Sequence, residues 1–130
     1  MARGLSNPTV EVNDVVIGIV PNSLSTKRGF GDRNVRAQSA GGNSVESVVT
    51  ENAETKLSMV KFSIYNTQDN QDLLDAWLRS SSTGSSGNTV RVSEAGQVEA
   101  YVNMVIPTEP ERPRGADAEI EIEFMGNPAA

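Results

Sequence analysis

Neither cysteine nor histidine occurs in this chain of 130 residues. Without cysteine the chain has no disulfide bond, no thiolate nucleophile and no sulfur ligand for zinc. Without histidine it lacks the imidazole base of the familiar catalytic triads. These absences exclude most known hydrolase mechanisms. We expect no catalytic residue, no cofactor and no metal site, and therefore no enzyme activity.

Long apolar runs are missing as well. The first nine residues and the last four are polar or small, and they resemble neither a signal peptide nor a membrane span. We therefore expect a soluble protein that is made inside the cell and has no membrane partner. The length suits about one domain, so we expect residues 1–130 to form a single domain around one core.

Basic residues are scarce in the second half of the chain. The net charge is −6, and residues 67–130 hold four Lys/Arg against eleven Asp/Glu, whereas residues 1–66 hold seven against six. Proteins that grip nucleic acid need a basic surface that displaces counterions, and no dense Lys/Arg stripe with interleaved aromatic residues is present. Tight binding of nucleic acid is not expected.

Two β-hairpins are predicted in the first half. Thr9 to Val12 alternates, the turn residues Asn13-Asp14 follow, and Val15 to Val20 is apolar. Residues 35–39 alternate before the turn signal Gly41-Gly42-Asn43, and Val45 to Val49 resumes a β-favouring pattern. The residues between them, Ser23 to Asn34, are rich in glycine and basic side chains and predict a long, exposed basic loop.

The middle of the chain predicts a strand and then a helix. In Lys56 to Tyr65 the apolar residues change face near Met59, so either a bulge lies there or both faces are partly covered. The next segment, residues 67–79, begins with the cap candidate Thr67, has acids in its first turn and a basic residue in its last. Its apolar stripe should pack on the sheet, with these anchors: Leu74, Trp77 and Leu78.

The second half returns to strands. A Ser/Gly-rich loop, a short strand over residues 89–93 and a turn precede a regular alternation that ends at Pro107. In that alternation we expect one buried face, formed by Val98, Ala100, Val102, Met104 and Ile106. A polar, proline-containing loop follows over residues 108–115, and residues 117–124 predict the last strand.

Three glutamates share one face of that last strand: Glu119, Glu121 and Glu123. The opposite face is apolar, so the three carboxylates should form a row that faces water. A metal site would need convergent ligands from loops, and no calcium-loop or zinc-protease spacing occurs. Nothing in the sequence singles out a glycosidase-like acid pair.

Two glycine motifs are interpreted as a turn and as part of a loop. Gly41-Gly42-Asn43-Ser44 lacks the Gly-Lys-Ser/Thr ending of a phosphate-binding loop and no helix follows it, so a tight turn is expected. Gly29-Phe30-Gly31 lies in the basic loop, where Phe30 either docks on a neighbouring molecule or folds inward.

The order of the segments is unusual. It runs through the first hairpin, Val20-Pro21-Asn22-Ser23-Leu24, the basic glycine loop, Val35-Arg36-Ala37-Gln38-Ser39-Ala40-Gly41-Gly42, Val45-Glu46-Ser47-Val48, Glu54-Thr55-Lys56, Val60-Lys61-Phe62 and the helix ending near Trp77. This order resembles that of phage tail tube proteins. The likeness covers most of the chain, and none of its motifs is catalytic.

The resemblance implies a mainly β fold, a β-sandwich or barrel-like tail-tube architecture with one flanking α-helix, related to type VI secretion tube proteins. Such proteins form stacked homohexameric rings in which the inner sheets of neighbours join into one barrel. It also implies a virion protein of the tail, assembled in the host cytoplasm. Its partners would be copies of itself, the tape measure protein and genomic DNA in the lumen, and a sheath protein if the tail is contractile.

Roles for particular residues follow from the same resemblance. The row Glu119, Glu121, Glu123 becomes the leading candidate for the lumen lining, because acidic walls repel DNA during ejection. The outer surface is the competing location for that row. The loop Ser23–Asn34 would be the long loop that reaches an adjoining subunit or ring, through Lys27, Arg28, Phe30 and Arg33.

Two other interpretations remain open. The chain is alternatively the tube protein of a related contractile injection or secretion system. From a different class, it is a carboxylate-dependent enzyme or a β-sandwich binding module that acts as a monomer. Whether the tail contracts is not indicated by any motif.

Overall fold

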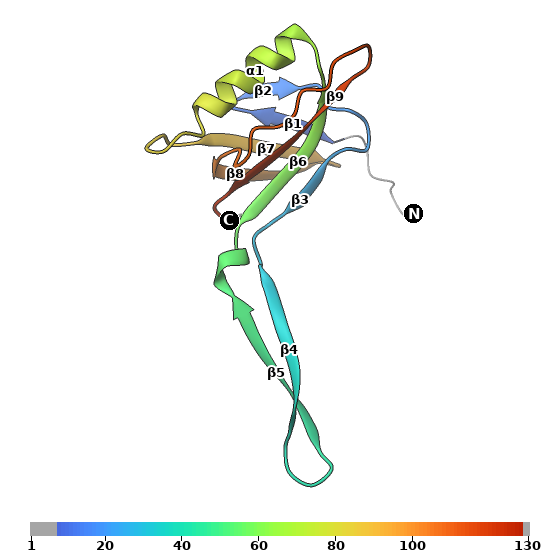
Figure 1. Cartoon of the computed structure of the whole chain (residues 1–130), viewed down its shortest axis with the longest axis vertical. Coiled ribbons are helices and arrows are strands. Elements are labelled where there is room, and N and C mark those ends of the chain that lie inside the picture. The colour runs from blue at the N-terminus through green and yellow to red at the C-terminus, as the bar shows by residue number, and fades with distance from the viewer. Residues whose placement is uncertain (1–7, 129–130) are drawn as a thin grey trace.

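The computed structural model describes residues 8–128 and shows a body with a long two-stranded arm that projects from it (Figure 1). The terminal segments at residues 1–7 and 129–130, used above in predicting the protein's location, lie outside the described residues. Within the described part, no helix combines the length and apolar character needed to cross a membrane.

The body contains two antiparallel sheets. One has the order β2-β1-β7-β8 and the other the order β3-β6-β9. The strands of the first sheet are β1 (Thr9–Val12), β2 (Val15–Ile17), β7 (Asn88–Glu94) and β8 (Gln97–Met104). Those of the second are β3 (Ser25–Lys27), β6 (Ser58–Tyr65) and β9 (Glu119–Gly126). The arm is the pair β4 (Asp32–Ser39) and β5 (Val45–Asn52), followed by the short 3-10 helix Ala53–Thr55.

One core lies between the inner faces of the two sheets. Its buried members from both sheets are Val10, Val12, Ile17, Val60, Phe62, Ile64, Val90, Val92, Tyr101, Met104, Ile120, Ile122 and Phe124. The sheets are also joined at one side, where Val105 and Met125 exchange two backbone hydrogen bonds of 2.8 Å. The mainly β architecture with one helix in the described chain is therefore confirmed.

The helix α1 (Gln68–Arg79) covers one end of the core (Figure 1). The Thr67 hydroxyl caps it by accepting a hydrogen bond from the Asn70 amide. Leu74 and Trp77 are buried and Leu78 is half-buried, so the predicted apolar stripe is confirmed. The Trp77 ring meets two strands edge-on, at centroid distances of 6.3 Å from Phe62 and 5.6 Å from Phe124.

The strand β6 has no bulge. Its residues pair with those of β9 in an unbroken register from Ser58 opposite Gly126 to Tyr65 opposite Glu119. Ser58 and the apolar residues at every second position face the core, while Met59 is half-buried on the other face. Of the two explanations offered for the change of face, partial cover of both faces is the correct one.

The buried face expected over residues 98–106 is wrong for three of its five residues. Val98 and Val102 are 60% and 49% exposed, Ala100 is also exposed, and Tyr101 from the opposite face is fully buried. A register shift near Asn88 and the left-handed backbone of Asn103, at φ 54°, let both Tyr101 and Met104 point inward. The larger Tyr101 ring fills the core, and the valine face is left outside.

The predicted loop Ser23–Asn34 is wrong as well. Ser25–Lys27 forms β3, which pairs with residues 59–61 of β6, and β4 begins at Asp32. Hydrogen bonding to β6 orders the backbone that glycine and charge content alone had indicated as loop. The projecting element is instead the arm, which contains the second predicted hairpin and is longer than predicted at its base.

Candidate assembly surfaces

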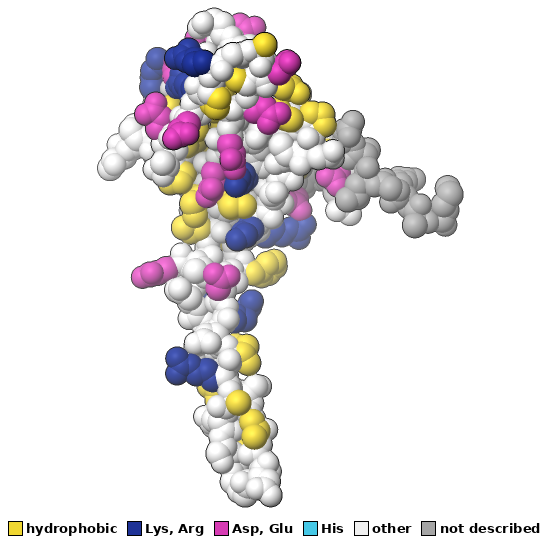
Figure 2. All heavy atoms as spheres, turned by 45° about the vertical axis from the view of Figure 1, so that its right-hand side comes forward, with side chains coloured by type: hydrophobic (Ala, Val, Ile, Leu, Met, Phe, Trp, Pro, Cys, Tyr) yellow, Lys and Arg dark blue, Asp and Glu magenta, His cyan; other side chains and the backbone are white. Residues whose placement is uncertain are grey.

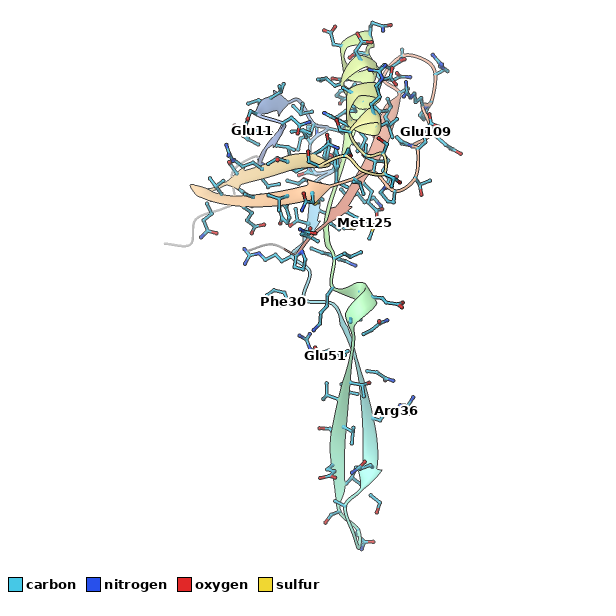
Figure 3. All side chains as sticks on the ribbon, turned by 90° about the vertical axis from the view of Figure 1, so that its left-hand side faces the viewer. Glu11, Phe30, Arg36, Glu51, Glu109 and Met125 are labelled. Carbon is cyan, nitrogen blue, oxygen red and sulfur yellow. The ribbon has the colours of Figure 1, made fainter. Side chains whose placement is uncertain are left out.

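The arm stands clear of the body along its whole length (Figures 1 and 3). Every residue of β4 and β5 is exposed except the half-buried Val48. Arg36, near the middle of β4, lies far from the body (Figure 3). A lone two-stranded hairpin is only marginally stable in water, so an arm of this length is expected to rest on another molecule.

The two faces of the arm differ in chemistry. Cross-strand partners such as Val35 and Val49 share a face, and the register places the small and apolar side chains together. That apolar face consists of Val35, Ala37, Ser39, Val45, Ser47 and Val49. The polar face consists of Asn34, Arg36, Gln38, Glu46, Val48 and Thr50. Figure 2 shows the apolar side chains along the arm.

The valines of the apolar face are left uncovered by the rest of residues 8–128. Val35, Val45 and Val49 are 63%, 70% and 54% exposed. Alternation of this kind usually indicates a strand with one buried face. We call this surface the arm face, and its pattern points to burial against a partner.

The root of the arm is held by ion pairs and caps. The carboxylate of Glu51 lies 3.6 Å from the Arg33 guanidinium and 2.6 Å from the Lys56 amine. These contacts, led by the Lys56 hydrogen bond, hold the pKa of Glu51 below its ordinary value. The Asp32 amide donates a 2.6 Å hydrogen bond to Thr55, so the 3-10 helix is tied to β4. These contacts join the two strands of the arm to each other and to the short helix at its root.

Of the predicted inter-subunit cations, Arg28 and Arg33 pair within their own chain. Arg28 binds Glu99 of β8, and the Tyr101 hydroxyl donates to the same carboxylate. The hydrogen bonds from Tyr101 and Arg28 lower the pKa of Glu99, while burial and that shared bond raise the pKa of Tyr101. Arg28 therefore ties the root of the arm to β8, and Arg33 is paired with the arm's own Glu51.

Lys27 and Phe30 line a cleft beside the root. No ion pair within residues 8–128 involves Lys27, and the Phe30 ring is 71% exposed. The cleft has a volume of about 600 Å³, with Leu57, Met59 and Met125 also in its wall. Phe30 thus points outward, as the docking alternative required, and lies close to the arm (Figure 3).

The predicted glutamate row lies on the outward face of β9. Glu119 and Glu121 are exposed and Glu123 is half-buried, while the intervening residues point into the core. Glu121 lies 2.5 Å from the Lys61 amine of β6, and this hydrogen bond raises the pKa of Lys61.

The loop after β8 extends the acidic surface. A groove of about 400 Å³ runs between the glutamate row and the loop of residues 107–113, which adds Glu109 and Glu111 to its wall. Arg112 of that loop binds Asp75 of α1 at 2.6 Å, which holds the loop against the body. Within the described residues, no three acidic side chains converge closely enough to hold a metal ion.

Sequence reasoning missed two surfaces, the arm face and the outward valines of β8. Val35 and Ala37 are two residues apart, and Val98 and Val102 are four apart, so the sequence already showed that each pair lies on one face of a strand. Periodicity does not indicate whether an apolar face is covered by the same chain or by another molecule.

A comparison with protein-family models gives no match to this chain, and no curated protein matches it at a significant level.

Proposed function

We propose that the chain is a structural subunit that joins copies of itself into a hollow tube, the tail tube of a long-tailed phage. In this proposal six copies close a ring, rings stack in the virion tail, and the lumen conducts DNA during ejection. The single observation that carries the proposal is the arm of residues 32–52, whose apolar face no other part of the described chain covers.

Open strand edges support the same function. The strands β2 and β3 each end a sheet, and unpaired edges of sheets promote association unless they are covered or charged. Ring closure would pair such edges between neighbouring copies. Assembly through arms and edges needs no catalytic group, cofactor or metal.

The glutamate row suits a lumen that DNA must cross without adhering. Duplex DNA carries about one negative charge per 1.7 Å of its axis, so a wall of exposed carboxylates repels it. The row and its groove hold five glutamates, Glu109, Glu111, Glu119, Glu121 and Glu123, with Lys61 beside them. Genomic DNA and the tape measure protein are the partners proposed for this surface.

Electron microscopy of the purified protein tests the proposal. We expect rings or tubes in negative stain at high protein concentration. A matched variant replaces residues 33–51 by an Asn-Gly turn, which can connect Asp32 to Asn52 because these residues are antiparallel cross-strand partners. This variant should stay folded and monomeric. An intact chain that remains a monomer at high concentration would contradict the tube.

Deletion of the predicted loop Ser23–Asn34 would test assembly less cleanly than the replacement of residues 33–51. Deleting residues 23–34 would remove β3 from its sheet as well as the start of the arm. The loss of backbone hydrogen bonds would damage the body, so failure to assemble would have two causes. The replacement of residues 33–51 leaves β3 and the Arg28–Glu99 contact in place.

Reversing the charge of the glutamate row should make assembled tubes retain DNA. We expect Glu119→Lys, Glu121→Lys and Glu123→Lys together to slow ejection and to cause salt-dependent DNA retention, because the lysines would attract phosphates. The triple glutamine variant is the control for shape, and it should assemble with little retention. Normal ejection by tubes of the lysine variant would place the row on the outer surface instead.

A second candidate is the tube protein of a related contractile injection or secretion system, where the same arm would serve the same assembly. In a contractile tail, a sheath protein would be a further partner of the outer surface. A monomeric binding module is the third candidate, and the microscopy above separates it from both tubes.

A further inference from the structure

The body carries a second uncovered apolar surface, on the outward side of β8. It consists of Val98, Ala100 and Val102, which repeat at every second residue, and we call it the β8 face. β8 ends its sheet, and beyond it only the extension at Val105 bonds to β9 within the described chain. A flat, apolar face on an edge strand favours association with another chain.

The arm face matches the β8 face in period. Residues two apart on a strand are about 6.6 Å apart, so Val35 and Ala37 have the same spacing as Val98 and Ala100. The β5 row of the arm face, Val45, Ser47 and Val49, also alternates branched and small side chains as the β8 face does, which allows two β faces to interdigitate when they pack.

The arm cannot reach the β8 face of its own chain. It leaves the body at the base of β3 and β6 and extends away from both sheets (Figure 1). The ion pairs of Glu51 brace the root of the arm, and the Arg28–Glu99 contact fixes the segment just before it on β8. Residues 8–128 of the same chain therefore cover neither face.

The local charge of the two surfaces allows a copy of the same chain to be the molecule that covers them. Copies of a chain with net charge −6 repel one another, so contact surfaces between them have to be locally neutral. The arm face is bordered by the pair Arg33–Glu51, and the β8 face by the pair Arg91–Glu11 at 3.2 Å. The acidic groove of β9, by contrast, would repel a copy.

The arm face is too small to hold two copies together by itself. Eight residues per strand give the arm a length of about 26 Å, and a width of about 10 Å makes its face roughly 260 Å². Stable interfaces bury about 800 Å² on each partner. One arm contact thus supports a weak dimer only, and each copy has to both donate and accept an arm while strand edges add further area.

We propose that the arm face of one copy packs on the β8 face of another copy. This inference rests on the proposed tube and names the acceptor of its arm. The contact is head-to-tail, because the two surfaces differ, and such contacts produce closed rings or continuing filaments.

Cross-linking between two single-cysteine variants tests the contact, because the natural chain contains no cysteine. One variant carries Val49→Cys on the arm face, and the other, with a mass tag, carries Val98→Cys or Val102→Cys. The two are mixed, assembled and treated with a bifunctional thiol reagent about 8 Å long. Packed sheets lie about 10 Å apart, which exceeds the reach of a disulfide.

The expected product is a cross-link between tagged and untagged chains in assembled material. Thr50→Cys, on the polar face beside Val49, is the matched donor control and should give about a thousandfold less product. The reason is that apposed thiols react at millimolar effective concentration, whereas free ones react at micromolar concentration.

The outcomes separate this inference from the proposed tube. Tubes in which Val49→Cys fails to cross-link to the β8 face, or links to Leu57→Cys in the root cleft instead, overturn the inference and leave the tube standing. A cross-linked dimer without rings or tubes supports the contact and contradicts the tube. Absence of both assembly and mixed product overturns both.

Discussion

Two aspartates on the arm face should abolish assembly while the body remains folded. In the variant Val35→Asp with Val49→Asp, the new carboxylates are cross-strand partners on the surface that we propose to be buried. Burying an unpaired charge costs several kcal/mol, and each 1.4 kcal/mol weakens association about tenfold. Light scattering and negative stain should show monomers at concentrations where the natural chain forms rings.

The opposite face of the same arm provides the control. Asn34→Asp with Thr50→Asp adds the same charge to the adjacent cross-strand pair on the polar face. This variant should retain most of its assembly, because its carboxylates stay in water. Equal loss of assembly in both variants would show that general charge or arm folding matters, and not the apolar face. Neither variant should change the unfolding of the body, since the arm adds no residue to the core.

Truncation of Trp77 should produce the largest loss of stability among single substitutions in the core. The indole is buried and contacts the rings of Phe62 and Phe124, so it joins α1 to two neighbouring strands of the second sheet, β6 and β9. Replacing a buried aromatic residue by alanine costs about 3–5 kcal/mol, which is a large share of the 5–15 kcal/mol of a typical domain. Urea unfolding of Trp77→Ala measures this loss.

A half-buried residue of the same helix gives the matched comparison. Leu73→Ala should cost clearly less, because Leu73 only borders the core. Both variants have to be measured where the chain is monomeric, since assembly adds to apparent stability by mass action. A loss for Trp77→Ala no greater than that for Leu73→Ala would contradict the central position of the indole.

Elements with local signals were predicted well. Asn13 and Asp14 adopt positive φ angles of 52° and 67°, as the tight turn of the first hairpin requires, and asparagine and aspartate tolerate this conformation. Thr67 caps the helix through its own side chain. In each case the residues that determine the structure are neighbours in the chain, so a sequence pattern contains the whole cause.

Elements that depend on distant contacts were predicted less well. Ser25–Lys27 forms a strand only because β6, some 34 residues later in the chain, offers it hydrogen bonds. Val98 and Val102 have the pattern of a buried face, yet Tyr101 takes the inward position after a local shift of register. The sequence pattern indicated an apolar face correctly and assigned it to the wrong side.

The sequence by itself determined the mainly β character, the helix with its apolar anchors, both hairpin turns and the row of glutamates, because period and turn chemistry act over a few residues. Only the tertiary structure decided that the second hairpin leaves the body as an arm, that Arg28 and Arg33 pair within their own chain, and that β8 turns its valines outward. The physical reason is that the core is formed by side chains from segments distant in sequence. Which apolar surfaces remain exposed therefore depends on how all of these segments pack together.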